Sequence, residues 1–232
     1  MAKITPGPLA GVVSGKIGNT VFSRGKYGPY IRNRMMPTRT QSAATQDVRG
    51  RLSNLSKVWG ALALSSKNAW KTWAQTHPVV DRLGATQVLQ GSAAFIQLNA
   101  RLIQALGTQI DNPPVASSPD AVSGLSVKSY VNTQAVTLSW TSGALGANEC
   151  LAVRIAAIDS VGRGYYANLL KLVHISVAAQ ATGLEVGVKF MERFGIMITG
   201  QELKVEVEVW NKTTGLISGR VFASCTVLAV AP

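Results

Sequence analysis

The segment Leu203-Lys-Val-Glu-Val-Glu-Val-Trp210 shows most directly which class of fold this chain adopts. Apolar and charged residues alternate along it with a period of two, as in a β-strand with one buried and one solvated face. The apolar positions are expected to point into a core: Leu203, Val205, Val207 and Val209. The charged positions are expected to point into solvent: Lys204, Glu206 and Glu208. We therefore interpret the two glutamates as solvation of an outer face and not as a catalytic pair of carboxylates.

Runs with the same period occur throughout the chain from residue 120 onward. Turn signals such as Ser142-Gly143 and Thr214-Gly215 separate them. About seven short strands of this kind predict an antiparallel β-sandwich. Trp140 stands two positions after Leu138 at the end of a strand, which favours an immunoglobulin-like sandwich. The other expected strands lie at 125–130, 135–140, 150–158, 166–175 and 221–228.

Between residues 41 and 111 the apolar spacing changes from two to three and four, which predicts helices. The apolar positions from Val48 to Leu62 predict one helix, whose start Ser42 or Thr45 could cap. A second helix is expected after Ser65 or Ser66 as far as His77-Pro78, so that the two form an αα-hairpin. A third helix is expected over 92–106 and is stopped by a glycine. We interpret the three tryptophans of the hairpin as core residues, because amphipathic helices bury their aromatic side chains.

The Pro- and Ser-rich stretch Asn112-Pro-Pro-Val-Ala-Ser-Ser-Pro119 is the clearest linker in the chain. It divides the sequence into a basic extended or β arm over 1–40, a helical domain over 41–111, the linker over 112–119 and a sandwich over 120–232. The expected fold class is α+β. It comprises a basic β-hairpin N-terminal arm, a small helical region and a C-terminal antiparallel immunoglobulin-like β-sandwich.

The positive charge is concentrated at the N-terminal end. The chain carries 23 Lys and Arg against 11 Asp and Glu, a formal net charge of +12. Residues 1–75 hold 12 of the basic residues and a single acid, Asp47, whereas residues 118–232 hold nine basic and eight acidic residues. This asymmetry favours an N-terminal region that meets a polyanion or an acidic protein surface. The alternative is a basic face that only keeps the protein soluble.

The N-terminal arm combines basic residues, aromatic residues and turn glycines. Short β-like runs around Val21 and Ile31 alternate with glycines, which predicts one or two hairpins that cannot bury a core alone. In a hairpin the basic residues would form a stripe. Arginine beside aromatic residues suits phosphate contacts with base stacking, and equally docking on acidic neighbouring subunits. The candidate interaction residues continue from the arm onto the first helix: Lys16, Arg24, Lys26, Tyr27, Tyr30, Arg32, Arg34, Arg39, Arg49 and Arg51.

No catalytic, cofactor or metal site is predicted. Cys150 and Cys225 lie in apolar strand-like runs without a CxxC motif, and we interpret them as buried thiols, with a disulfide between them left open. Neither His77 nor His174 has a second ligand at metal spacing or the setting of a nucleophilic triad. The chain has no phosphate-binding glycine motif, no apolar run long enough to span a membrane and no visible secretory signal. The sequence therefore predicts a protein that is not an enzyme and uses no cofactor.

Five stretches of the N-terminal half form a recognisable pattern: Gly15-Lys-Ile-Gly-Asn-Thr-Val-Phe-Ser-Arg-Gly-Lys-Tyr-Gly-Pro-Tyr-Ile-Arg-Asn-Arg34, Thr45-Gln-Asp-Val-Arg49, Leu52-Ser-Asn-Leu-Ser-Lys-Val-Trp-Gly-Ala-Leu62, Ser66-Lys-Asn-Ala-Trp-Lys-Thr-Trp-Ala74 and Gly91-Ser-Ala-Ala-Phe-Ile-Gln-Leu-Asn99. Through this pattern residues 11–104 resemble an uncharacterised family of phage and prophage proteins. The resemblance implies a virion structural role for a protein made in the bacterial host cytoplasm. Its implied partners are other virion proteins and further copies of itself. No catalytic residue follows from it.

The expected function is a non-enzymatic structural component of a phage particle, in the capsid, neck or tail, anchored through the basic arm and the helices. Two alternatives from other classes stay open. The first is a nucleic-acid-binding protein that contacts phosphates through the basic N-terminal region, with binding that weakens steeply as salt rises. The second is a sandwich that binds a receptor or glycan through Trp210, Tyr165 and Tyr166, although packing is the commoner role of such side chains.

Overall fold

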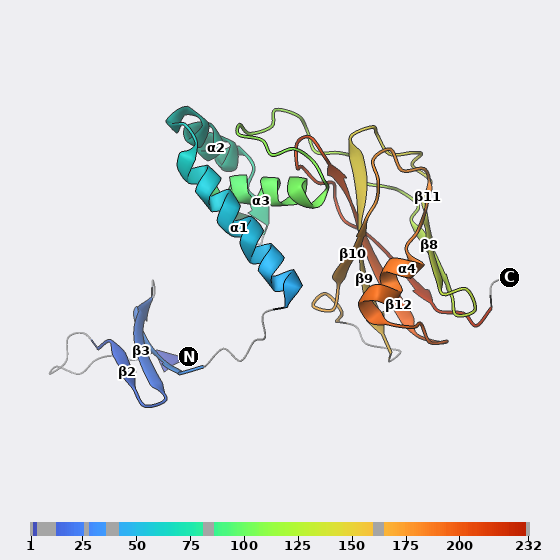
Figure 1. The fold of residues 1–232 in the computed structure, drawn as a ribbon, viewed down its shortest axis with the longest axis horizontal. Helices are drawn as coiled ribbons and strands as arrows, with labels where there is room; N and C mark the ends of the chain where they lie inside the picture. The colour runs from blue at the N-terminus through green and yellow to red at the C-terminus, as the bar shows by residue number, and fades with distance from the viewer. Residues whose placement is uncertain are drawn as a thin grey trace. The chain divides into compact units, whose positions relative to one another are not determined.

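The structure is a computed structural model that describes residues 2–3, 13–25, 28–35, 42–80, 86–159 and 165–230. Its contacts divide the chain into two compact units, Met1–Asp47 and Val48–Pro232. The described residues form both α-helices and antiparallel sheets, which confirms the mixed α+β class expected from the sequence (Figure 1).

The first unit contains a four-stranded antiparallel sheet in the order β1-β4-β3-β2. Gly18 and Asn19 form the turn between β2 and β3, and the φ angle of 54° at Gly18 suits glycine. The sheet is therefore built from two consecutive hairpins and a short additional strand. Its strands are β1 (Ala2–Lys3), β2 (Gly15–Ile17), β3 (Thr20–Gly25) and β4 (Gly28–Asn33).

Three helices lie close to their expected places: α1 (Ala43–Ala61), α2 (Leu64–Thr76) and α3 (Gly91–Gln104). The Ser42 hydroxyl caps α1 by accepting the N–H of Thr45 at 3.3 Å. The indole of Trp70 packs edge-on against Phe95 with ring centroids 5.6 Å apart, and Trp59 lies 5.5 Å away on another side of Phe95. Trp70 is fully buried, which confirms its expected core role. A short ribbon, β5 (Val79–Val80) and β6 (Thr86–Gln87), precedes α3.

The remainder of the chain forms two antiparallel sheets with a common core. One sheet has the order β10-β9-β12-β13 and the other β11-β8-β7. After β13, Leu228 crosses to the second sheet, where its N–H donates to the Ser129 carbonyl at 3.0 Å. The strands are β7 (Ser126–Tyr130), β8 (Ala135–Ser139), β9 (Glu149–Ile158), β10 (Lys171–Ile175), β11 (Gly183–Glu185), β12 (Glu202–Asn211) and β13 (Val221–Thr226).

The core between the two sheets matches the alternation read from residues 203–210. The four apolar positions of β12 that were expected to point inward are each 0–1% exposed. They meet β9 residues of the same sheet and Val136, Leu138 and Trp140 of the opposite sheet in one hydrophobic cluster. The period-two pattern therefore identified the inner face of β12 correctly.

Two features of the β region differ from the expectation. The predicted strand at 166–175 begins only at Lys171, because Tyr166 and Leu169 close a turn through a backbone hydrogen bond of 2.8 Å. An eight-residue helix that the sequence reading missed, α4 (Gly187–Phe194), packs against β8 and β10 and buries Phe190. No side-chain cap marks its start, so the usual sequence signal of a helix N-terminus is missing.

The expected linker at 112–119 lies within the second unit, because the helices pack directly on the β region. Leu216, in the turn after β12, belongs to the same hydrophobic cluster as Trp70 and Phe95. A Cβ atom on Gly215 would come within 2.7 Å of the Leu98 carbonyl oxygen. Only a glycine allows α3 and this turn to approach so closely.

Candidate functional site

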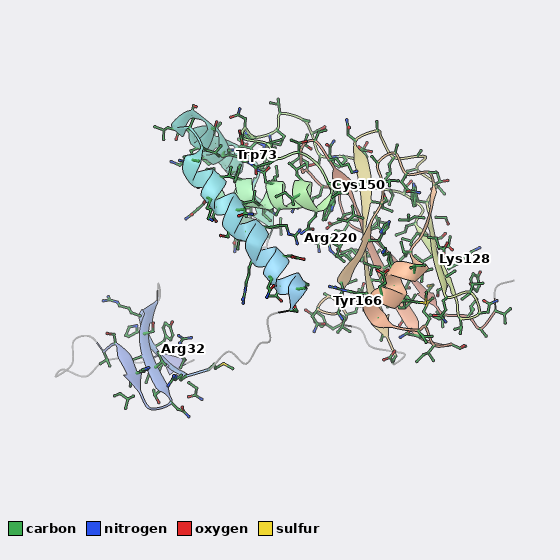
Figure 2. All side chains as sticks on the ribbon, viewed as in Figure 1. Arg32, Trp73, Lys128, Cys150, Tyr166 and Arg220 are labelled. Atoms are coloured by element: carbon green, nitrogen blue, oxygen red, sulfur yellow. The ribbon has the colours of Figure 1, made fainter. Side chains whose placement is uncertain are left out.

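One face of the N-terminal sheet gathers three of the candidate basic residues. Antiparallel partners point to the same side of a sheet, and β3 residue Val21 pairs with both Lys16 of β2 and Arg32 of β4. Arg34 continues the alternation from Arg32, and its N–H donates to the carbonyl of Asn19 at 2.6 Å. Tyr30 lies on the same face, since it is two residues before Arg32. The face combines three exposed cations, among them Arg32 (labelled in Figure 2), with the half-buried ring of Tyr30.

Arg24 lies on the opposite face, so the expected single stripe of arginines is wrong in this respect. It pairs with Pro29, one position out of phase with Tyr30 and Arg32. The alternation of the strands therefore sends it to the other side. Its face is largely apolar and carries Ile17, which is 74% exposed, together with Phe22 and Ile31, which are half-buried.

The other candidate residues fall outside this sheet. Lys26, Tyr27 and Arg39 lie outside the described residues. Arg49 and Arg51 belong to α1 in the second compact unit. Two residues apart on a helix, they point to nearly opposite sides and cannot form a common stripe.

The described side chains of the N-terminal sheet have no core of their own. None of those between residues 13 and 35 is buried, including the apolar side chains of Phe22 and Ile31. A two-sided sheet with both faces open exposes apolar surface that a partner would cover at a gain of about 25 cal/mol per Å².

A second concentration of charge, which the sequence reading missed, lies on the outer face of β9 and β12. Arg154 forms ion pairs of 2.7 Å with Glu206 and 2.9 Å with Glu208. Arg220 lies 2.9 Å from Glu208 and 3.6 Å from Glu206. The indole N–H of Trp210 donates to Oε2 of Glu208 at 3.0 Å. Arg220, labelled in Figure 2, completes the cluster from the chain segment just before β13.

The two glutamates are buried, which corrects the expectation that they face solvent. Glu206 is 3% and Glu208 1% exposed. Their side chains do point away from the inner core, as the alternation requires, but other groups cover that outer face. The arginines pair with the carboxylates, and Ala105 beyond α3 packs nearby against Trp210. A lone arginine inside the apolar run Leu151-Ala-Val-Arg-Ile-Ala-Ala-Ile158 was the sequence signal for this cluster.

Two opposing influences determine the protonation state of the Glu208 carboxyl group. Burial alone would raise the pKa of its carboxyl group. The hydrogen bond from Trp210 and the positive charges of Arg154 and Arg220 outweigh that effect and hold the pKa below its usual value. Glu208 is therefore an ionised, structurally engaged carboxylate and not an acid poised for proton transfer.

The two cysteines are both free thiols, and their positions leave them far apart. Along β12, Cys150 is paired with Trp210 and Cys225 with Leu203, seven residues away. Seven residues of strand span about 23 Å, far beyond the distance that a disulfide bridges. Burial raises the pKa of both thiols, although a hydrogen bond with Ser129 partly offsets this at Cys225. The interpretation as buried thiols is confirmed for Cys150, whereas Cys225 is only half-buried.

The remaining candidates are the side chains considered for glycan stacking, His174 and possible metal ligands. Trp210 is 3% exposed, so it cannot stack on a glycan, whereas Tyr165 is 60% exposed. Burial lowers the pKa of His174 on β10, and the nearby charge of Lys189 lowers it further. Within the described ranges, no group of three or more His, Cys, Asp or Glu side chains could hold a metal ion. No helix among the same residues is long and apolar enough to cross a membrane.

Comparisons with known proteins give structural neighbours at low similarity. No family model and no curated protein matches the chain. It is similar to an Fn3-like protein from Clostridium thermocellum at 14% identity and a TM-score of 0.31, over 50% of this chain and 98% of that one. It is also similar to CopC from Methylosinus trichosporium OB3b at 18% identity and a TM-score of 0.22, over 50% of this chain and 89% of that one.

Proposed function

We propose that this chain is a non-enzymatic structural component of a phage particle. In this proposal the N-terminal sheet docks on an acidic protein surface of the capsid, neck or tail. The immunoglobulin-like sandwich of the second unit then serves as the part presented to neighbours or to the outside. The partners are other virion proteins and further copies of the chain itself.

The observation that carries the proposal is that no described side chain of the N-terminal sheet is buried. Its strands are paired, yet on the apolar face Ile17 is 74% exposed and Phe22 and Ile31 are only half-buried. The other face adds Lys16, Arg32 and Arg34 to an N-terminal third that is strongly basic. A partner with an apolar patch and an acidic surface would cover the apolar face and pair with the cations of the basic face. This supports anchoring through the N-terminal sheet.

Mass spectrometry of purified, dissociated virions tests this function. The protein is expected in stoichiometric amounts, with a copy number set by the symmetry of the structure that it joins. A variant with Lys16, Arg32 and Arg34 all changed to alanine is expected to be incorporated at a level at least tenfold lower than the unchanged protein. Arg24→Ala, on the opposite face, is the matched control for the loss of a cation. Absence of the unchanged protein from virions would refute the structural role.

Nucleic acid is the second candidate partner, and one observation favours it. Lys16, Arg32 and Arg34 share a face with Tyr30, which is the pairing of cations with an aromatic ring that single strands and phosphates select.

Salt-dependent binding separates this second candidate from the first. Binding to DNA is expected to weaken as salt rises. The slope of the logarithm of the binding constant against the logarithm of the salt concentration should fall in magnitude by about 0.9 for each phosphate contact removed. The triple alanine variant should lower the slope, and Arg24→Ala should leave it nearly unchanged. Fluorescence anisotropy on a labelled oligonucleotide between low and physiological salt measures this. Binding that does not respond to salt would exclude nucleic acid as the partner of this face.

A further inference from the structure

A cavity of about 500 Å³ lies in the second unit, apart from the N-terminal surface to which the proposed function is assigned. Its walls come from α2, α3, the β5 strand and the turn that follows β12. Residues far apart in the sequence, such as Trp73, Arg101 and Ile217, meet around it. The volume matches the range of pockets that hold small organic ligands.

One wall of the cavity is a preformed aromatic surface. The rings of Trp73 and His77 are stacked, with centroids 4.2 Å apart and an angle of 9° between their planes. Nδ1 of His77 lies 2.9 Å from both the Thr76 hydroxyl and the Trp73 carbonyl oxygen, so the imidazole is held in place. Figure 2 labels Trp73 at the helical end of this unit. Such a rigid wall suits a flat or branched apolar group, because little side-chain freedom is lost on binding.

The rest of the lining is apolar except for a few polar groups. Leu98, Leu216 and Ile217 contribute aliphatic surface. Gln97 and Arg101 of α3 supply an amide and a guanidinium group. This combination of an apolar body with a small number of polar side chains is typical of sites that orient an amphipathic molecule.

Arg101 is the Lys or Arg side chain among the residues that line the cavity. Burial lowers the pKa of its guanidinium group, Glu208 raises it, and the neighbouring positive charges of Arg154 and Arg220 lower it again. No carboxylate of the described residues lies within 4.0 Å of Arg101, in contrast to Arg154 and Arg220. Arg101 is therefore a half-buried guanidinium group without an ion-pair partner among the described residues, and an anion bound in the cavity would supply one.

We propose that this cavity binds an apolar monocarboxylate, with its carboxylate on Arg101 and its apolar body against Trp73 and His77. A single negative charge pairs with the one guanidinium group of the lining, whereas a phosphate dianion would bring a second charge among largely apolar walls. The carboxylate belongs either to a free organic acid or to the C-terminus of a short apolar peptide. The site stands independently of the role proposed for the N-terminal sheet.

Titration of the full chain with matched probes tests the proposal. The free-acid arm uses 4-phenylbutyrate and the peptide arm uses N-acetyl-Leu-Phe, each compared with its own primary amide by isothermal titration calorimetry. Both carboxylates, or one of them, are expected to bind at least tenfold more tightly than the matching amide, since a charge-assisted contact is lost in the amide. Whichever arm binds more tightly identifies the source of the carboxylate. Equal affinity of the acid and its amide would overturn the proposal. So would the absence of binding by either acid at probe concentrations up to about 10 mM.

Arg101→Gln assigns the selectivity to the cavity. We expect this variant to lose the tenfold preference for the carboxylate over the amide. The control Arg193→Gln, an exposed arginine on α4, should keep it. A second measurement uses the unchanged protein, so that it does not depend on whether the variant folds. On addition of the acid, the NMR signals of the Trp73 indole and of the Gln97 side-chain amide should shift. Shifts confined to other parts of the chain would place the binding elsewhere and reject this site.

Discussion

Replacing Glu208 by alanine is expected to lower the free energy of unfolding by about 3 kcal/mol. The substitution would leave Arg154, Arg220 and the more distant Arg101 facing Glu206 alone, and it would remove the acceptor of the Trp210 indole N–H. The loss falls at the lower end of values for broken buried ion pairs, because Arg154 and Arg220 keep partial contact with water. Urea unfolding followed by circular dichroism measures the change.

A matched control for Glu208 is Glu192→Ala. Glu192 on α4 also forms an ion pair, with Lys189 at 3.0 Å, but both side chains are about half exposed. Such pairs contribute roughly 0–1 kcal/mol, so this substitution should change stability little. Equal effects of the two substitutions would contradict the view that burial of the cluster makes it important.

The same carboxylate should make stability depend on acidity. Its pKa is lower in the folded chain than in the unfolded chain, where it is about 4.3. The stabilisation by Glu208 is therefore present at a pH above its pKa in the unfolded chain. It is lost as the pH falls through its pKa in the folded chain. The stability difference between the unchanged protein and Glu208→Gln should shrink as the pH is lowered from about 5. A difference that stayed constant over this range would show that Glu208 does not titrate as inferred.

Trp70→Ala is expected to cost about 3–5 kcal/mol, since it removes a fully buried aromatic side chain from the helical core. Trp70 packs against Phe95, and its indole N–H donates to the Asp111 carbonyl at 2.8 Å. Trp70→Phe should cost less because it keeps an aromatic ring while losing this hydrogen bond. The control Leu64→Ala, at a position that is 71% exposed, should change stability by less than about 1 kcal/mol.

The way Trp70→Ala unfolds also tests whether the helices and the sheets form one cooperative unit. Leu216 joins the helical cluster, and Gly215 lies against the Leu98 carbonyl, so loosening the helices should also loosen the β region. Far-ultraviolet dichroism and near-ultraviolet tryptophan signals should therefore change at the same urea concentration. Two separate transitions would mean that the helices unfold on their own.

The sequence predicted the inner face of β12 better than its outer face. Alternation along 203–210 correctly separated the two faces of β12, because a strand sends successive side chains to opposite sides. It could not show whether the outer face would be covered. That depends on Arg101 of α3 and on Arg220, which are distant in sequence from Glu206 and Glu208. Burial of these carboxylates was therefore missed.

The expected grouping of Arg24 with Arg32 and Arg34 was wrong for a related reason. Spacing along one strand predicts which residues share its face, but the face shared with a neighbouring strand depends on register. The register of β3 and β4 pairs Arg24 with Pro29, and this places Arg24 on the face opposite to Arg32. The hairpins were predictable from the turn glycines, whereas the grouping of Lys16, Arg32 and Arg34 required the register.

The separation of the two thiols has a consequence for how β9 and β13 are held on either side of β12. Because Cys150 and Cys225 belong to distant positions of the ladder, oxidation cannot join them without dismantling that strand. The backbone hydrogen bonds and the packed side chains of the three strands therefore hold this part of the sheet together without a disulfide between these two residues.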